Sequence, residues 1–183
     1  MSHWHLNQAA RIIDAGGVIA YPTEAVYGLG CHPEYFPAVQ KILELKHRSM
    51  LKGLILVAAN TNQLAPYVDF SAAKNMDQVQ QSWPGPVTWL LPASPLVPIW
   101  IKGVHSKVAV RVSAHPIVQQ LCTATGVLVS TSANPGQYPP AKTAFRVRKY
   151  FGDSLDYILQ GGVDERAQPS MIKDAESGAV IRK

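Results

Sequence analysis

With 183 residues, the chain has the length of one domain, and its 47% hydrophobic content excludes a disordered protein. Its formal net charge of +5 favours an anionic partner, either nucleic acid or a phosphorylated small molecule. Cys31 and Cys122 lie far apart without a C-x-x-C pair, which argues against a zinc site or a redox motif. We find neither a signal peptide nor an apolar run near the roughly 20 residues of a membrane span, so we expect a cytoplasmic protein with no membrane partner.

Helices and strands are predicted to alternate, from hydrophobic periodicity and from glycine and proline breaks. In chain order we expect a helix at 6–15, a strand at 18–21, a helix at 37–46, a strand at 54–59, a helix at 71–82, strands at 87–91 and 107–112, a helix at 115–124, a strand at 127–130, a helix at 143–151, a strand at 157–159 and a hairpin of 170–174 with 179–182. The proline-rich stretch 92–103 is expected to be a loop. This alternation predicts an α/β fold: a single domain over 1–183 with an open, mixed sheet flanked by helices.

Cations gather between the helix expected at 37–46 and the buried strand expected at 54–59. The helical pattern fades after Leu45, and residues two apart share a side in extended chain, so Lys46 and Arg48 can converge on one anion. Lys52 follows on the same loop. Arginine would bind a polyphosphate with two nitrogens and lysine as a point charge. The alternative is a cationic last turn of a helix, favoured by the helix dipole.

Polar residues also follow two of the predicted strands. Thr23 comes at the carboxyl end of the first strand, where ligands bind in open α/β sheets. The alternative is that Thr23 or Glu24 only caps a following helix. Ser130, Ser132 and Asn134 face one side of an emerging strand by the period of two, which favours a ligand-contacting edge over a plain strand end with a turn.

An arginine inside an apolar strand needs a partner for its charge. Arg111 stands in the run VAVRV, so it must pair with a carboxylate, which could be Glu24, Asp69 or a ligand. Ser170 and Arg182, on the C-terminal hairpin, read by themselves as ordinary surface residues.

Six segments in this order resemble the YrdC-like family, the threonylcarbamoyl-AMP synthases, in its short bacterial form. They are YPTEAVYGLG at 21–30, KHR at 46–48, PGPVT at 84–88, VRVSAHP at 110–116, SAN at 132–134 and PSMI at 169–172. The resemblance implies a basic concave cavity in a twisted sheet. It also implies a reaction: L-threonine and bicarbonate form a carbamate, whose oxygen attacks the α-phosphate of ATP to give threonylcarbamoyl-AMP and pyrophosphate. A threonylcarbamoyl-transfer complex then modifies tRNAs that read ANN codons, and tRNA is a further candidate partner.

The resemblance also implies roles for residues. Lys46 and Arg48, with Lys52, would neutralise the triphosphate, and Mg²⁺ would arrive with ATP rather than at a protein metal cluster. The implied nucleotide contacts are Lys46, Arg48, Lys52, Ser132, Asn134 and Arg182. The implied threonine contacts are Thr23, Arg111, Ser130 and Ser170, with Arg111 on the carboxylate.

The sequence departs from the family pattern at three places. Ser49 follows the arginine where the family usually has proline. Pro135, Gly136 and Gln137 replace x-S-G after the asparagine, so a serine contact to phosphate at Gly136 is lost or supplied elsewhere. Met171 stands where many relatives have a small polar residue.

A different class of protein stays open: a non-catalytic RNA- or ribosome-binding protein. It would spread its contacts over many cations, including Arg146, Arg148 and Lys149, with steep salt dependence. The polar row at 130–134 favours the enzyme, because phosphate-backbone binding needs no such edge. A third reading is a regulator that holds ATP without turnover. Under the enzyme reading, Lys46 and Arg48 are expected to be exposed loop cations whose removal stops turnover and leaves the fold intact.

Overall fold

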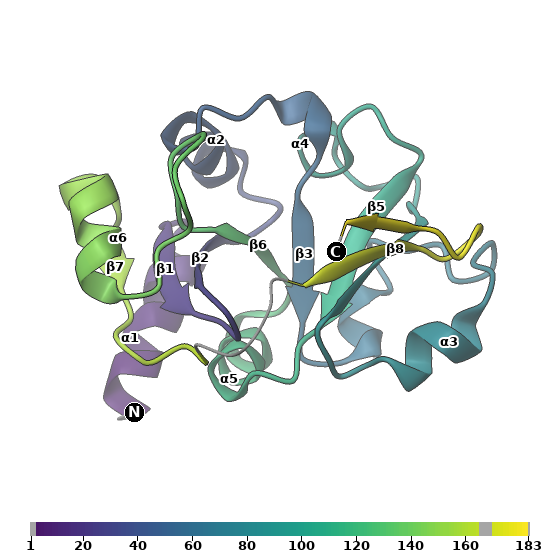
Figure 1. Ribbon diagram of the computed structural model, residues 1–183, viewed down its shortest axis with the longest axis horizontal. Coiled ribbons are helices and arrows are strands. Elements are labelled where there is room, and N and C mark those ends of the chain that lie inside the picture. The colour runs from purple at the N-terminus through teal and green to yellow at the C-terminus, as the bar shows by residue number, and fades with distance from the viewer. Residues whose placement is uncertain (1–2, 165–169, 183) are drawn as a thin grey trace.

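The computed structural model describes residues 3–164 and 170–182 (Figure 1). Its helices are α1 His3–Asp14, α2 Phe36–Leu45, α3 Met76–Gln81, α4 Ile99–Lys102, α5 Pro116–Thr125 and α6 Ala144–Phe151, with short 3-10 turns η1 Met50–Lys52, η2 Thr61–Leu64 and η3 Gly152–Ser154. Its strands are β1 Ile19–Pro22, β2 Tyr27–Cys31, β3 Ile55–Ala58, β4 Val87–Pro92, β5 Lys107–Val112, β6 Leu128–Ser132, β7 Tyr157–Ile158, β8 Met171–Asp174 and β9 Val180–Arg182.

The nine strands of the described residues form one sheet in the order β7-β1-β2-β6-β3-β5-β4-β8-β9. The pairs β1 with β7, β3 with β5 and β4 with β8 are parallel, and the remaining neighbours are antiparallel. The open, mixed sheet flanked by helices that the sequence predicts is therefore confirmed. The C-terminal hairpin is confirmed as well, and its β8 extends the sheet beside β4 (Figure 1).

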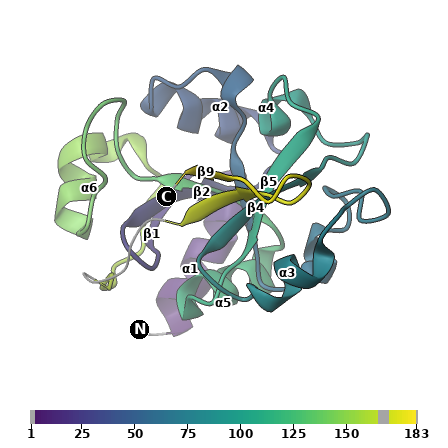
Figure 2. The same ribbon diagram turned by 45° about the vertical axis from the view of Figure 1, so that its right-hand side comes forward.

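Apolar side chains cover both faces of the sheet. On one face Ile19, Tyr21 and Leu128 pack with buried residues of α1 and α5, two helices that lie side by side (Figure 2). On the other face Leu29 and Val129 pack in the larger cluster, to which α2 and α6 contribute. Alternate residues of β2 and β6 thus face opposite layers, as the pleat requires. Within the described residues, no helix has the length and apolar character needed to cross a membrane.

Three elements differ from the sequence prediction. The helix expected at 71–82 forms only as α3, because the Asp69 carboxylate accepts bonds from Ser71 and Ala72 and holds that stretch in a turn. The loop expected at 92–103 contains the short helix α4. The strand β2 was not predicted, since two of its five residues are glycines, which are depleted in strands.

Candidate active site

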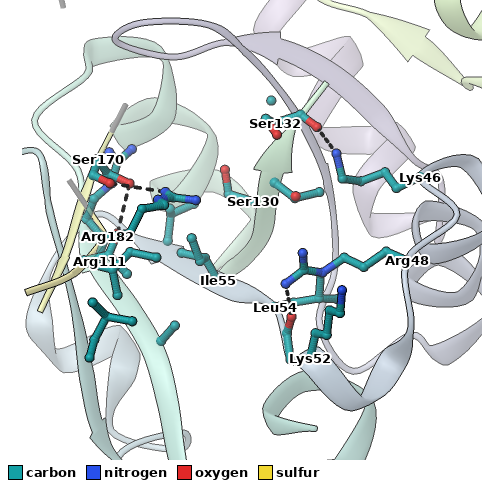
Figure 3. A pocket seen from close by; sticks show the side chains of 18 of the residues that line it. Lys46, Arg48, Lys52, Leu54, Ile55, Arg111, Ser130, Ser132, Ser170 and Arg182 are labelled. Carbon is teal, nitrogen blue, oxygen red and sulfur yellow. Dashed lines mark hydrogen bonds between the residues drawn. The ribbon is translucent and has the colours of Figure 1, made fainter. Parts of the chain in front are cut away.

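A cavity of about 1380 Å³ opens on the sheet face that carries Tyr21 and Leu128, beyond the part that α1 and α5 cover. Figure 3 shows Lys46, Arg48 and Lys52 on one side of it and Arg111, Ser170 and Arg182 on the other. All ten predicted site residues line this cavity: Thr23, Lys46, Arg48, Lys52, Arg111, Ser130, Ser132, Asn134, Ser170 and Arg182. The fold thereby brings residues from Thr23 to Arg182 together at one cavity. Their individual roles stay predictions.

Lys46 comes at the end of α2 and turns inward. His47 has a φ of 49°, which reverses the chain so that Lys46 and Arg48 both reach the cavity. The Lys46 ammonium donates to the backbone oxygen of Ser132, and to the backbone oxygen and Oδ1 of Asn134 at 2.9 and 3.1 Å. Lys46 is only 7% exposed, so the expectation of an exposed loop cation is wrong. Three protein oxygens replace the water that such a cation would otherwise need.

Burial lowers the pKa of the Lys46 ammonium to about 8, and the positive charge of Arg48 acts in the same direction. Arg48 is half-buried and donates from Nη2 to the Gly53 carbonyl at 3.0 Å, while its buried Nε finds no acceptor among the described residues. Burial lowers the pKa of Arg48 too, and the Arg182 guanidinium adds to this effect. These cations therefore repel one another in the free protein, and a bound anion would relieve that repulsion.

Arg111 is paired within the protein. Its Nη2 lies 2.9 Å from Glu24 Oε2, so of the three candidate partners Glu24 is confirmed. Ser113 Oγ donates to the other Glu24 oxygen at 2.9 Å. Burial raises the pKa of the Glu24 carboxyl, but Arg111 and the hydrogen bonds outweigh it, so the net pKa is lowered. Arg111 Nε is buried and finds no hydrogen-bond acceptor in the described part of the chain.

Thr23 closes the turn between β1 and β2. Its Oγ1 donates to the Val26 carbonyl at 2.7 Å, and its backbone N–H donates to the same oxygen at 3.1 Å. The alternative that Thr23 caps a helix is wrong, because the strand β2 follows instead. The Thr23 side chain still borders the cavity from this turn.

The polar side chains at the end of β6 are fixed by hydrogen bonds within the protein. Ser132 Oγ donates to Asn134 Oδ1 at 2.7 Å, and Asn134 Nδ2 donates to the Tyr138 carbonyl at 2.8 Å. Ser130 Oγ accepts from the Tyr21 hydroxyl at 2.8 Å. Across the cavity, Arg182 Nη2 donates to the Ser170 carbonyl at 3.2 Å. Ser170 and Arg182 are thus part of the cavity wall, not isolated surface residues.

The cavity is also bordered by polar residues that the sequence did not point to as site residues. Thr88 donates to Ser170 Oγ at 3.2 Å, and its place in the segment PGPVT was the available signal. Lys107 pairs with Asp174 at 2.7 Å across two strands that are not neighbours in the sheet, which no local pattern indicates. No group of three His, Cys, Asp or Glu side chains within 3–164 and 170–182 is arranged to hold a metal ion.

Comparison with known proteins shows which family this chain belongs to. A family model for Sua5, YciO and YrdC, described as telomere recombination, matches residues 11–183. This chain belongs to that family. It is 51% identical over 181 residues to a Nitrosococcus oceani protein named threonylcarbamoyl-AMP synthase, covering 98% of each chain. A Pseudomonas aeruginosa protein of the same name is 50% identical over 182 residues, which cover 100% of this chain and 98% of the relative.

Solved structures of the family share the fold. The P. abyssi Sua5 complex with L-threonine superimposes with a TM-score of 0.87 at 32% identity, over 95% of this chain and 52% of that one. This chain therefore spans about half of that larger protein. The E. coli YciO structure gives a TM-score of 0.84 at 26% identity, over 100% of this chain and 90% of that one.

The structure shows where each departure from the family pattern lies. Ser49 accepts a bond from the Leu51 N–H at 3.3 Å and caps η1, which constrains the loop where proline is usual. Gln137 takes the left-handed φ of 68° at the place of the family's glycine. A Cβ on Gly136 would lie 3.0 Å from the Lys46 carbonyl, so a side chain at this position would be tightly packed against the end of α2. Met171 lies in β8, and the preceding Pro169 is outside the described residues.

Proposed function

We propose that this chain makes L-threonylcarbamoyladenylate and pyrophosphate from L-threonine, bicarbonate and ATP. The observation that carries the proposal is that one cavity gathers all ten residues expected for this reaction, in a chain half identical to proteins named threonylcarbamoyl-AMP synthase. The volume of about 1380 Å³ exceeds the 300–1000 Å³ typical of a single small-ligand pocket, which suits two substrates held together.

The cations of the cavity would hold the triphosphate. Lys46, Arg48 and Lys52 approach it from the segment after α2, and Arg182 approaches it from β9 on the opposite wall (Figure 3). Adenylation needs little covalent help from the protein, because positioning and charge neutralisation do most of the work. Mg²⁺ would arrive on the phosphates of ATP and add neutralisation there. The described carboxylates form no metal cluster, and Glu24 is already engaged with Arg111.

The opposite side would hold threonine. Thr23, Ser130 and Ser170 line the cavity with hydroxyl-bearing side chains, and the Arg111 guanidinium, whose Nε has no partner among the described residues, would bind the carboxylate. In the reaction, the nitrogen of the threonine amine forms a bond to the carbon of bicarbonate, a carbon–oxygen bond breaks, and a carbamate and water result. A carbamate oxygen then forms a bond to the α-phosphorus while the bond from that phosphorus to the β-phosphate oxygen breaks, and pyrophosphate leaves with the electron pair.

The product would pass to a threonylcarbamoyl-transfer complex that modifies tRNAs reading ANN codons, and this work would take place in the cytoplasm. The alternative of a non-catalytic RNA-binding protein gains no support from the relatives' names. The test is pyrophosphate release by the purified protein with ATP, Mg²⁺ and bicarbonate, with and without L-threonine. Release that requires both threonine and bicarbonate supports the proposal, while release that ignores threonine contradicts it.

A further inference from the structure

Tyr21 reaches across a neighbouring strand to touch the cavity wall. It lies on β1, whereas Ser130 lies on β6, and β2 runs between these two strands. Adjacent strands are about 4.8 Å apart, so the tyrosine side chain must span two strand spacings to meet the serine. The Tyr21 hydroxyl nevertheless lies 2.8 Å from Ser130 Oγ, and the Tyr21 side chain is fully buried.

Glycines in β2 leave room for this crossing. Gly28 is paired opposite Tyr21, and Gly30 is paired opposite Ser130, so both glycines lie under the path of the ring. A Cβ on Gly30 would lie 2.6 Å from Tyr21 Cε1 and 2.9 Å from the Val129 carbonyl, so no side chain fits there without displacing the ring. A Cβ on Gly28 would lie 3.5 Å from both Tyr21 Cζ and Ser130 Oγ. In the segment YPTEAVYGLG, the two glycines thus let the tyrosine ring cross the face of the second strand.

The contact fixes the polarity of Ser130. A phenol has one hydrogen, and Tyr21 donates it to Ser130 Oγ. Burial raises the pKa of the Tyr21 phenol well above its ordinary value, so the hydrogen stays in place. Ser130 Oγ therefore accepts a hydrogen bond from Tyr21, and no acceptor for the Ser130 hydroxyl hydrogen is found among the described residues. Since Ser130 borders the cavity, that hydrogen is free for a ligand oxygen.

We propose that Tyr21 is a positioning residue that makes Ser130 a hydrogen-bond donor toward a carboxylate or carbamate oxygen of the threonine substrate. The inference rests on the proposed function for the identity of the substrate. The bond itself, between two side chains 109 residues apart, is independent of that function.

The test is a double-mutant cycle of Tyr21→Phe and Ser130→Ala, with two readouts on each protein. Loss of one hydrogen bond is expected to raise the KM for L-threonine about three- to tenfold in each single variant, with the KM for ATP unchanged. The double variant should be no worse than the more affected single variant, because both changes remove the same contact. Melting temperatures should show the same non-additivity.

Tyr67→Phe is the matched control. Tyr67 is also buried and donates its hydroxyl to Glu34 at 3.1 Å, away from the residues that line the cavity. It should lower the melting temperature as Tyr21→Phe does, without changing the KM for threonine.

The outcomes separate the two claims. Non-additive melting with additive or absent effects on threonine would show a structural bond only and overturn the positioning role. Additive melting would overturn the contact itself. A wild-type protein without threonine-dependent turnover would overturn the proposed function, and with it the assignment of threonine to Ser130, even where melting proves the bond.

Discussion

The Lys46 ammonium lies 2.9 Å from the backbone oxygen of Asn134 and 3.1 Å from its Oδ1, although the two residues are 88 positions apart. The segments KHR and SAN are therefore joined in the free protein, before any substrate arrives. This contact gives Lys46 two tasks: it fixes the end of β6, and it brings positive charge to the cavity.

Lys46→Ala is expected to lower both stability and turnover. The substitution removes the ammonium donor from three oxygens near the end of β6, although Asn134 Oδ1 keeps Ser132 Oγ and the Ser132 carbonyl keeps the Asn134 N–H. The loss costs about 1–3 kcal/mol of unfolding free energy, mainly at the Asn134 carbonyl. Turnover should fall about 100-fold or more through the lost charge. Urea unfolding and pyrophosphate release measure the two effects. Lys52→Ala is the control for stability, since Lys52 is exposed and should leave the unfolding midpoint unchanged. A Lys46→Ala protein as stable as the wild type would contradict the described contact.

The pH dependence of ATP use should report Lys46. Its pKa of about 8 means that the ammonium is present below this pH and lost as the pH rises through it, so kcat/KM for ATP should fall above about pH 8. The stability of the fold should change in the opposite direction and rise with pH. The unfolded state keeps the proton up to the ordinary pKa of 10.5, so the penalty for burying the charge fades between about pH 8 and 10.5.

Lys46→Arg provides the check on this assignment. A guanidinium stays charged throughout the range, so the fall in kcat/KM near pH 8 should disappear in this variant. A fall that persists unchanged would assign the titration to another group.

Arg111→Ala should raise the threonine requirement and also weaken the fold. Removing the guanidinium leaves the partly buried Glu24 carboxylate with Ser113 and without its cation, which costs about 3 kcal/mol. Adding Glu24→Ala should recover part of that loss, because the uncompensated charge is then gone. Unfolding by urea and the KM for threonine separate the two effects. A variant that only melts earlier, with an unaltered KM for threonine, would make Arg111 a structural ion-pair member alone.

Gln137→Gly should stabilise the protein. Gln137 holds a φ of 68°, a left-handed conformation that costs a side-chain-bearing residue about 1 kcal/mol or more. Part of this gain is offset by the greater freedom of glycine in the unfolded chain, so we expect a net gain of about 0.5 kcal/mol. Gly178→Ala tests the same effect in reverse, since Gly178 has a φ of 72° and open space around its Cα. A lower melting temperature for Gln137→Gly would contradict this account.

The sequence predicted most of the fold, because helix and strand periods depend on neighbouring residues. Together with the resemblance to the family, which alone selected Ser170 and Arg182, it indicated ten residues that meet in one cavity. What it missed depends on contacts between distant segments. Lys46 was expected to be exposed, since nothing local indicates that backbone oxygens of β6 surround it. The contact of Tyr21 with Ser130 across β2 could be predicted only from the order of strands in the sheet, and no short sequence motif indicates that order. Glu24 was only one of three candidate partners for Arg111 for the same reason.

Under the proposed function, this chain activates threonine as its carbamate and not as the free amino acid. The most direct test is to supply carbon-labelled bicarbonate with ATP, Mg²⁺ and L-threonine, and to identify the adenylate by mass spectrometry. Synthesis through the carbamate should give threonylcarbamoyl-AMP that carries the bicarbonate label, in amounts equal to the pyrophosphate released. Threonyl-AMP without the label, or pyrophosphate release without a labelled adenylate, would contradict it.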